Sequence, residues 1–304
     1  IEVLEGLTPV RKRPGMYIGG TDETAYHHLA SEILDNSIDE AVAGHAKVIS
    51  VKLINKNTIT ISDDGRGIPI DKHPRKKKTA LEVVMTSLHS GGKFNNNIYK
   101  SSAGLHGVGL SVVNALSSKL NIRITKNAKI YNQDYSRGKI LNKLRLKGKS
   151  KIKNGTQITF SPDPEIFGKE LSFNPEIIYE LSKNKAYLQK GVKINWECSR
   201  NLLNRKSQIP IKETLIFPKG LEEFVINEVK QNNALHEKVC FQSGNFENNK
   251  GRMEFALQFN KNKIKYGKAF CNTVYNKNGG THESGFKSGI AKSIRKYAKS
   301  KNNK

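Results

Sequence analysis

The sequence is poor in cysteine, in long apolar runs and in acidic residues. Its three cysteines, Cys198, Cys240 and Cys271, are far apart and lack CxxC spacing, which argues against a disulfide framework or a zinc site and fits a reducing, cytoplasmic environment. No stretch approaches about 18 uncharged apolar residues, so we expect no membrane span. The sequence does not start with an apolar stretch followed by a small-residue cleavage site, so nothing in it indicates secretion.

The shortage of acid leaves a strongly basic chain. The chain has 52 Lys and Arg residues and 27 Asp and Glu residues, which gives a net charge of +25. Only 11 of the cations are Arg, whereas nucleic-acid-binding surfaces rely on Arg for bidentate contacts. Two clusters stand out: residues 119–153 hold 12 cations and one acid, and residues 287–304 hold seven cations and no acid. Compositional drift and a selected electrostatic role both remain open.

The apolar content nevertheless supports a folded chain. Hydrophobic residues make up 36% of 304 residues, enough for one large or two ordinary domains. Periodicity predicts helices at 24–43, 80–89, 110–118, 174–190, 221–230 and from about 284, and strands at 48–54, 58–62, 192–197, 251–260, 264–272 and in several segments up to 161. Because most strands are joined as hairpins, we predict an α+β fold, with domains at 1–211 and 212–304.

The predicted helix at 24–43 carries a narrow polar stripe. At about 100° per residue, His28, Glu32, Asp35, Asn36 and Asp39 share one side, opposite a face of apolar residues. A carboxylate with a histidine one turn before it could act as an oriented general base. Asn36 offers the neutral oxygen that Mg²⁺ accepts. The same pattern is also typical of a solvated helix face.

Two glycine-containing motifs follow. The string DDGRGIP at 63–69 places a carboxylate beside a tight turn after a strand, where it could accept a hydrogen bond from a base amino group, although ordinary Asp-Gly turns share this pattern. The string GLHGVG at 104–109 runs into a predicted helix, whose free N–H groups could hold phosphate. The glycines, cations and aromatic residue at 90–100 would form a lid over such phosphates.

Taken together, these three motifs resemble those of the GHKL ATPases. The strings VRKRPGMYIG at 10–19, LHSGGKF at 88–94 and GGTHE at 279–283 make the chain similar to the ATPase subunit of bacterial type II topoisomerases over nearly its whole length. Two paralogous groups share these strings, the B subunits of gyrase (GyrB) and those of topoisomerase IV (ParE). Segments 1–7, 161–168 and 182–188 look more like the ParE group.

The resemblance implies roles for individual residues. Glu32 would be the general base that polarises the water attacking the γ-phosphate of ATP. His28 would help to position that water, and Asn36 would bind Mg²⁺. Asp63 would recognise adenine with Thr156, and Glu40 would pair with Arg66 at the pocket mouth. The remaining nucleotide-binding residues would be Gly67, Ile68, Pro69, Lys93, Tyr99, Gly104, Leu105, His106, Gly107, Val108 and Gly109.

The resemblance also implies a GHKL (Bergerat) sandwich followed by a partial, ribosomal-S5-like transducer domain. The expected partners are DNA, a cleavage subunit (ParC, or GyrA for gyrase) and a second copy, with which ATP binding would close a clamp around DNA. Departures from the family pattern are Ala103, where a glycine is usual, and Lys126, where an arginine is usual. We expect a fragment without the N-terminal arm, the transducer-loop lysine or the metal-binding cleavage domain, and so weakly active alone.

Two other functions compete. A basic nucleic-acid-binding module without catalysis would explain the charge but not the helix stripe or the glycine loop. A different GHKL ATPase, such as a chaperone or mismatch-repair protein, would share the three core motifs but not VRKRPGMYIG or LHSGGKF.

Overall fold

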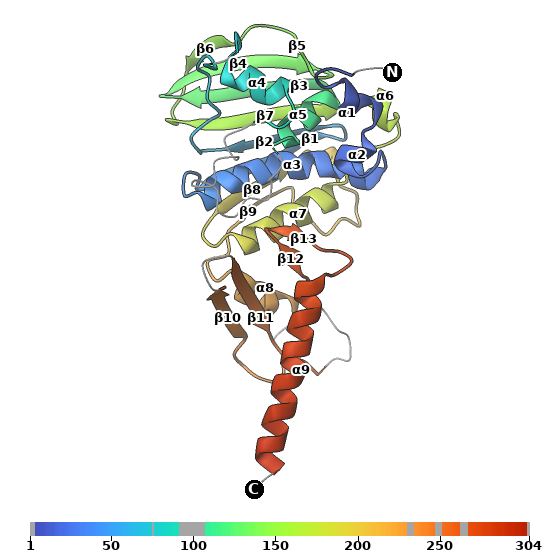
Figure 1. The fold of residues 1–304 in the computed structure, drawn as a ribbon, viewed down its shortest axis with the longest axis vertical. Helices are drawn as coiled ribbons and strands as arrows, with labels where there is room; N and C mark the ends of the chain where they lie inside the picture. Colours follow the sequence, from blue (N-terminus) through green and yellow to red (C-terminus); the bar gives the residue numbers. More distant parts are fainter. Residues whose placement is uncertain are drawn as a thin grey trace.

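The computed structural model describes residues 4–74, 76–90, 107–229, 234–246, 251–261 and 267–302. Figure 1 shows a large sheet with helices in front of it at one end of the molecule, smaller elements below, and one long helix projecting away.

Within these ranges, nine strands form one mixed sheet. Its order is β5-β4-β3-β7-β2-β1-β8-β9, and β6 also pairs with β4. Only β1 and β8 run parallel; every other recorded pair in this sheet is antiparallel. The strands are β1 (Val48–Asn55), β2 (Thr58–Asp63), β3 (Ser117–Lys126), β4 (Lys129–Ser136), β5 (Lys139–Ile140), β6 (Arg145–Lys149), β7 (Gly155–Pro162), β8 (Lys193–Cys198) and β9 (Lys212–Leu215).

Helices cover one face of this sheet (Figure 1). Local sequence sets their starts: the Asp22 side chain accepts a hydrogen bond from the Ala25 amide at 2.9 Å, and Thr79 and Glu82 form a reciprocal capping box. The helices are α1 (Thr8–Lys12), α2 (Gly15–Ile18), α3 (Glu23–Val42), α4 (Ala80–Thr86), α5 (Gly109–Ala115), α6 (Pro164–Phe167) and α7 (Pro175–Leu188), and a 3-10 turn follows at Arg200–Leu202.

The core lies between the sheet and these helices. Alternate residues of the strands face it, as in β1, where Ile49, Val51 and Leu53 are buried and their neighbours are not. Tyr26 of α3 and Trp196 of β8 are among the largest fully buried side chains. This layer fixes α3 and α5 against the sheet.

The rest of the described chain forms smaller elements. These are α8 (Leu221–Glu228), the antiparallel pair β10 (Cys240–Asn245) and β11 (Arg252–Leu257), the pair β12 (Phe270–Cys271) and β13 (Val274–Tyr275), and α9 (Thr281–Asn302). In Figure 1, α9 extends far beyond its neighbours. No helix in the described ranges is long and apolar enough to cross a bilayer.

The predicted α+β class, the helix at 24–43 and the hairpin at 48–62 are confirmed, with small shifts at the ends. The helices predicted at 80–89 and 110–118 end earlier, at Thr86 and Ala115. β10 was not predicted, because its last four residues are polar or glycine and the strand shows no alternation of apolar residues. The large sheet extends to Leu215 through β9, past the boundary predicted at 211; the division into two domains stays a prediction.

Candidate functional site

The predicted polar stripe of α3 is confirmed for His28 and Glu32 and wrong for its two aspartates. His28 and Glu32 lie side by side at the surface, with His28 Nε2 3.2 Å from Glu32 Oε1. The hydrogen bond to Glu32 raises the pKa of His28 above its usual value, so the pair favours a charged imidazole. Asp35 and Asp39, however, are buried, which the helical angles alone did not predict.

Glu32 also lies against the first residue of α5. A Cβ atom added to Gly109 would collide with Glu32 Oε2, so only glycine leaves room for the carboxylate at this position. The N-terminal end of a short helix is therefore next to the candidate base. Gly107 precedes it with a positive φ of 61°, and Val108 packs against the core.

Asn36 follows Glu32 one turn later on α3. Its Nδ2 donates to the Glu32 backbone carbonyl at 2.7 Å. Because the amide nitrogen is committed to that bond, the side-chain oxygen is the atom suited to a hard cation. A single neutral oxygen fits Mg²⁺, which takes most of its remaining ligands from water and phosphate.

Asp63 ends β2 in a buried position. The Ser37 hydroxyl donates to its Oδ2 at 2.9 Å, and the Gly65 amide donates to its Oδ1 at 3.0 Å. Burial raises the pKa of Asp63 to about 6, against the opposing effect of these bonds. The carboxylate is thus held in one orientation by two donors and can still accept from a third group.

Neighbouring strands constrain Asp63 and the turn that follows it. Thr156 of β7 lies opposite Asp63 in the register of the neighbouring strands β2 and β7, while their joint role stays a prediction. Gly67 has a φ of 72°, and a Cβ there would come within 2.9 Å of the Thr125 carbonyl. The turn therefore needs glycine. Ile68 packs against the core and Pro69 is exposed.

The predicted pair of Glu40 and Arg66 is confirmed. Arg66 Nη2 donates to Glu40 Oε1 at 2.8 Å, and its Nε and backbone amide both donate to Oε2 at 3.1 Å. Lys126 Nζ donates to the Arg66 carbonyl at 3.0 Å. This lysine therefore helps to fix the turn that follows Asp63.

Part of the predicted site lies outside the described residues. These residues are Lys93, Tyr99, Gly104, Leu105 and His106. The two ends that flank this segment are joined, because the Ser90 amide donates to the Gly107 carbonyl at 3.2 Å. The Ser90 hydroxyl also donates to the Ser87 carbonyl at 2.6 Å, which fixes Ser90 to the end of α4.

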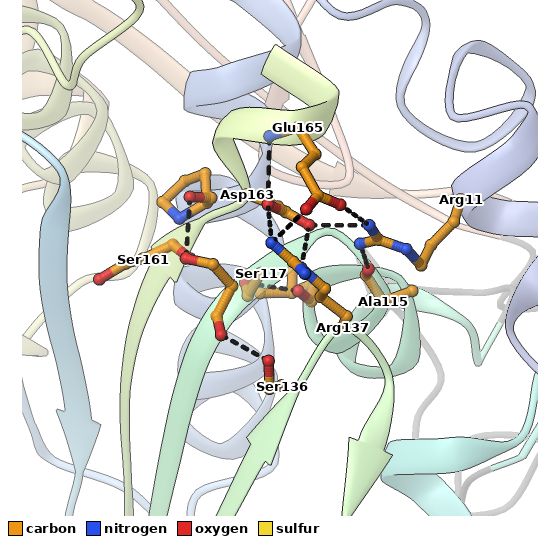
Figure 2. Close-up of polar contacts among 11 residues, drawn as sticks. Arg11, Ala115, Ser117, Ser136, Arg137, Ser161, Asp163 and Glu165 are labelled. Carbon is orange, nitrogen blue, oxygen red and sulfur yellow. Dashed lines mark hydrogen bonds and ion pairs between the residues drawn. The ribbon is translucent and has the colours of Figure 1, made fainter. Parts of the chain in front are cut away.

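The far end of α5 is held by a charged cluster (Figure 2). The fully buried Asp163 is paired with Arg11 at 2.8 Å and with Arg137 at 2.9 Å. Arg11 also donates to the Ala115 carbonyl, the last residue of α5, at 2.8 Å. Through this cluster the N-terminal segment, the end of β7 and α5 form one unit.

Sequence reasoning missed Ser37 and Lys185. Ser37 lies one residue after Asn36 and orients Asp63, but a serine in a helix gives no signal of its own. Lys185, buried on α7, forms an ion pair with Asp35. Its position between buried residues of an amphipathic helix was an available signal.

Comparisons with known proteins agree with this geometry. Residues 21–166 match the family described as histidine kinase-, DNA gyrase B-, and HSP90-like ATPase, and residues 220–304 match the DNA gyrase B family. The chain is 50% identical over 308 residues to the B subunit of DNA topoisomerase 4 from Rickettsia felis, covering 100% of this chain and 46% of that protein. It is 41% identical over 297 residues to the B subunit of DNA gyrase from Campylobacter jejuni, covering 98% of this chain and 37% of that protein.

A solved structure is also similar. It is the 43K ATPase domain of Thermus thermophilus gyrase B in complex with an aminocoumarin, with a TM-score of 0.78 and 35% identity, covering 98% of this chain and 74% of that one. The chain spans less than half the length of these curated relatives.

Proposed function

Because the chain belongs to the gyrase B family of ATPases, as the ATPase region of the B subunit of a type II topoisomerase, we propose that it binds ATP and hydrolyses it with Glu32 as general base. The observation that carries the proposal is the placement of the Glu32 carboxylate between His28 and the first residue of α5. A base there would face phosphate bound at the glycine turn that leads into this helix.

His28 and Asn36 complete this part of the proposal. His28 holds the Glu32 carboxylate in one orientation, so that a water molecule can be activated on its other side. Asn36 would hold Mg²⁺ through its side-chain oxygen, the nitrogen being used by the Glu32 carbonyl. When bound, the cation would neutralise charge on the phosphates.

Asp63 would select the base. Its carboxylate is held by Ser37 and Gly65, and it would accept a hydrogen bond from the adenine amino group. Gly67, Ile68 and Pro69 would border the ring, Thr156 would support Asp63, and Arg66, fixed by Glu40, would lie at the pocket mouth. An aminocoumarin, as in the related structure, would use the same pocket.

The phosphate-binding part of the proposal extends to residues outside the described ranges. Gly107 and Val108 lead into α5, which begins at Gly109. We assign the phosphate-binding lid to Lys93, Tyr99, Gly104, Leu105 and His106, together with these three residues, on the resemblance of the motif.

In the whole protein, we propose that this region drives passage of one DNA duplex through another in the cytoplasm. ATP binding would dimerise two copies around DNA, and a cleavage subunit would cut both strands of the duplex that is crossed. The similarity to topoisomerase 4 proteins favours the ParE form, with ParC as partner; the gyrase form, with GyrA, is the alternative. Decatenation without negative supercoiling would support the first, and ATP-driven negative supercoiling the second.

The test of the ATPase proposal is turnover in the intact protein. Glu32→Ala should lower kcat for ATP by about 10²–10⁴-fold while nucleotide binding is kept, because the carboxylate acts on water rather than on the nucleotide. The control is Glu23→Ala, which removes an exposed carboxylate from the same helix and should leave ATP turnover at the wild-type rate. Unchanged turnover in Glu32→Ala would remove this residue from the mechanism.

A further inference from the structure

Lys185 joins three parts of the molecule from a buried position. Only 3% of its side chain is exposed, and it lies on α7, between α3 and the β12–β13 hairpin. Its Nζ forms an ion pair with Asp35 Oδ1 of α3 and donates to the Thr273 carbonyl at 2.8 Å and to the Thr273 hydroxyl at 3.2 Å. Thr273 thus accepts two hydrogen bonds from the ammonium, and Asp35 supplies its counter-charge.

The α3 end of this link is close to the proposed base. Asp35 lies three residues after Glu32, so both carboxylates project from neighbouring turns of one helix. The charges of Asp35 and Lys185 both act on the pKa of His28, which is itself paired with Glu32. A change in how Lys185 is held would therefore reach the pair of His28 and Glu32 through the electric field and through the position of α3.

The other end lies in a short, constrained turn. Asn272 and Thr273 connect β12 to β13, and both have a positive φ, 47° and 70°. Such values are unfavourable for a β-branched residue like threonine, so surrounding contacts must hold the turn in place. The bonds from Lys185 are two of those contacts.

We propose that Lys185 is a positioning residue that couples ATP turnover at Glu32 to the placement of the β12–β13 hairpin. If the hairpin moves, Lys185 loses two of its three partners and its hold on Asp35 changes; if α3 shifts with bound nucleotide, the hairpin loses its anchor. The proposal rests on the proposed function, because it assumes that Glu32 acts on ATP. Lys268, just before β12, also contacts α7 through Glu180 and Asn184. These contacts should keep the hairpin next to α7 when Lys185 is altered.

The test separates this coupling from simple charge neutralisation. Lys185→Met alone leaves the buried Asp35 unpaired and endangers folding. The double variant Asp35→Asn/Lys185→Met removes both charges and should keep the wild-type unfolding temperature within a few degrees. We expect it to lower kcat for ATP at least about tenfold with KM within about twofold, because orientation is lost but the nucleotide contacts remain. Lys183→Met, on the same helix, is the control and should turn over ATP like the wild type.

Amide hydrogen exchange at residues 270–275 gives the second readout, measured in the full chain with and without Mg²⁺ and adenylyl-imidodiphosphate. In the wild type and in Lys183→Met, nucleotide should change exchange in this hairpin; in the double variant it should not. A folded double variant with wild-type kcat, or with the wild-type exchange response, would overturn the coupling. A wild type that hydrolyses ATP with no response in the hairpin would overturn it too, whereas a wild type that does not hydrolyse ATP would contradict the proposed function itself.

Discussion

Asp63 shows at the scale of a single residue how the surroundings of a buried carboxylate control its charge and orientation. Two donors, the Ser37 hydroxyl and the Gly65 amide, hold its carboxylate, while burial opposes its ionisation. A carboxylate in such a position changes its charge near neutral pH rather than near pH 4. Its hydrogen-bonding capacity should change over the same interval.

ATP binding should therefore weaken as the pH falls through 6. With a pKa of about 6, Asp63 is almost fully ionised at pH 7.5 and mostly protonated at pH 5.5, which would reduce the affinity about fourfold if only the carboxylate form binds. Isothermal titration across this range checks the prediction. Asp63→Asn should bind ATP and an aminocoumarin weakly at every pH; binding unaffected by this substitution would exclude Asp63 from the site.

The same pKa predicts a stability trend with the opposite sign. Because burial raises the pKa of Asp63 in the folded chain, folding favours its protonated form, and its contribution to stability is complete below pH 4 and lost as the pH rises through 6. Binding and stability thus make opposite demands on this residue, as is common where a polar group is buried for function.

Gly109 gives a second prediction at the residue scale. In Gly109→Ala the added methyl would displace the Glu32 carboxylate, a flexible side-chain end, without straining the backbone. We expect a folded protein with an unfolding temperature near that of the wild type, and a kcat lower by about 10²-fold, since small displacements of a reacting group have effects of this size. The control is Gly289→Ala, because Gly289 lies on α9 with open space around it. Gly19→Ala would not serve, because Gly19 has a positive φ that strains an alanine.

At the scale of elements, α5 links the site to the N-terminal segment. Its first residue lies against Glu32, and its last carbonyl accepts a hydrogen bond from Arg11 of α1. Arg11 is in turn paired with Asp163, where β7 runs into α6 (Figure 2). Changes in the N-terminal segment can reach Glu32 through this one short helix.

Asp163→Asn should lower the free energy of unfolding by about 2 kcal/mol at pH 7, because it removes a buried charge from two arginines, of which Arg11 is partly exposed and Arg137 is more exposed. Asparagine can keep the cap on the Glu165 amide. The hydrogen bonds and arginines lower the pKa of Asp163, so its contribution is present above pH 4 and lost as the pH falls below it. Urea denaturation at pH 7 and pH 3 should show the difference from the wild type shrinking at the lower pH.

The sequence alone predicted the elements whose signals are local. The 3.6-residue period of α3, the alternation of β1 and β2, and the grouping of Glu32 with His28 all follow from neighbouring residues. What it could not predict depended on distant partners. Asp35 looks like a surface residue on the helix and is buried because Lys185, 150 positions away in the chain, neutralises it.

At the scale of the whole molecule, the two basic clusters lie on different parts. The cluster at 119–153 covers β3 to β6 of the large sheet, whereas the described part of the one at 287–304 lies along α9. Helix α9 is about 33 Å long, and nearly all its described side chains are exposed. A long, exposed, cationic helix is the better candidate for contact with DNA phosphates.

Salt dependence can distinguish the clusters. Replacing Lys292, Lys296 and Lys299 of α9 with Gln should reduce the slope of log affinity for duplex DNA against log salt by roughly 2.7, since each phosphate contact contributes about 0.9. The matched control replaces Lys143, Lys147 and Lys149, which are equally exposed and equally charged. Equal losses in both variants would mean that the net charge, rather than α9, accounts for DNA binding.

The cluster on the sheet has a consequence of its own. All five residues of β6 are exposed, and within the described chain the strand pairs only with β4, so its other side is an open edge able to template a strand from another molecule. Arg145, Lys147 and Lys149 place three cations along that edge. A second copy approaching it would bring the same charges face to face, which opposes pairing. Part of the lysine surplus thus protects the chain from aggregating through its own sheet.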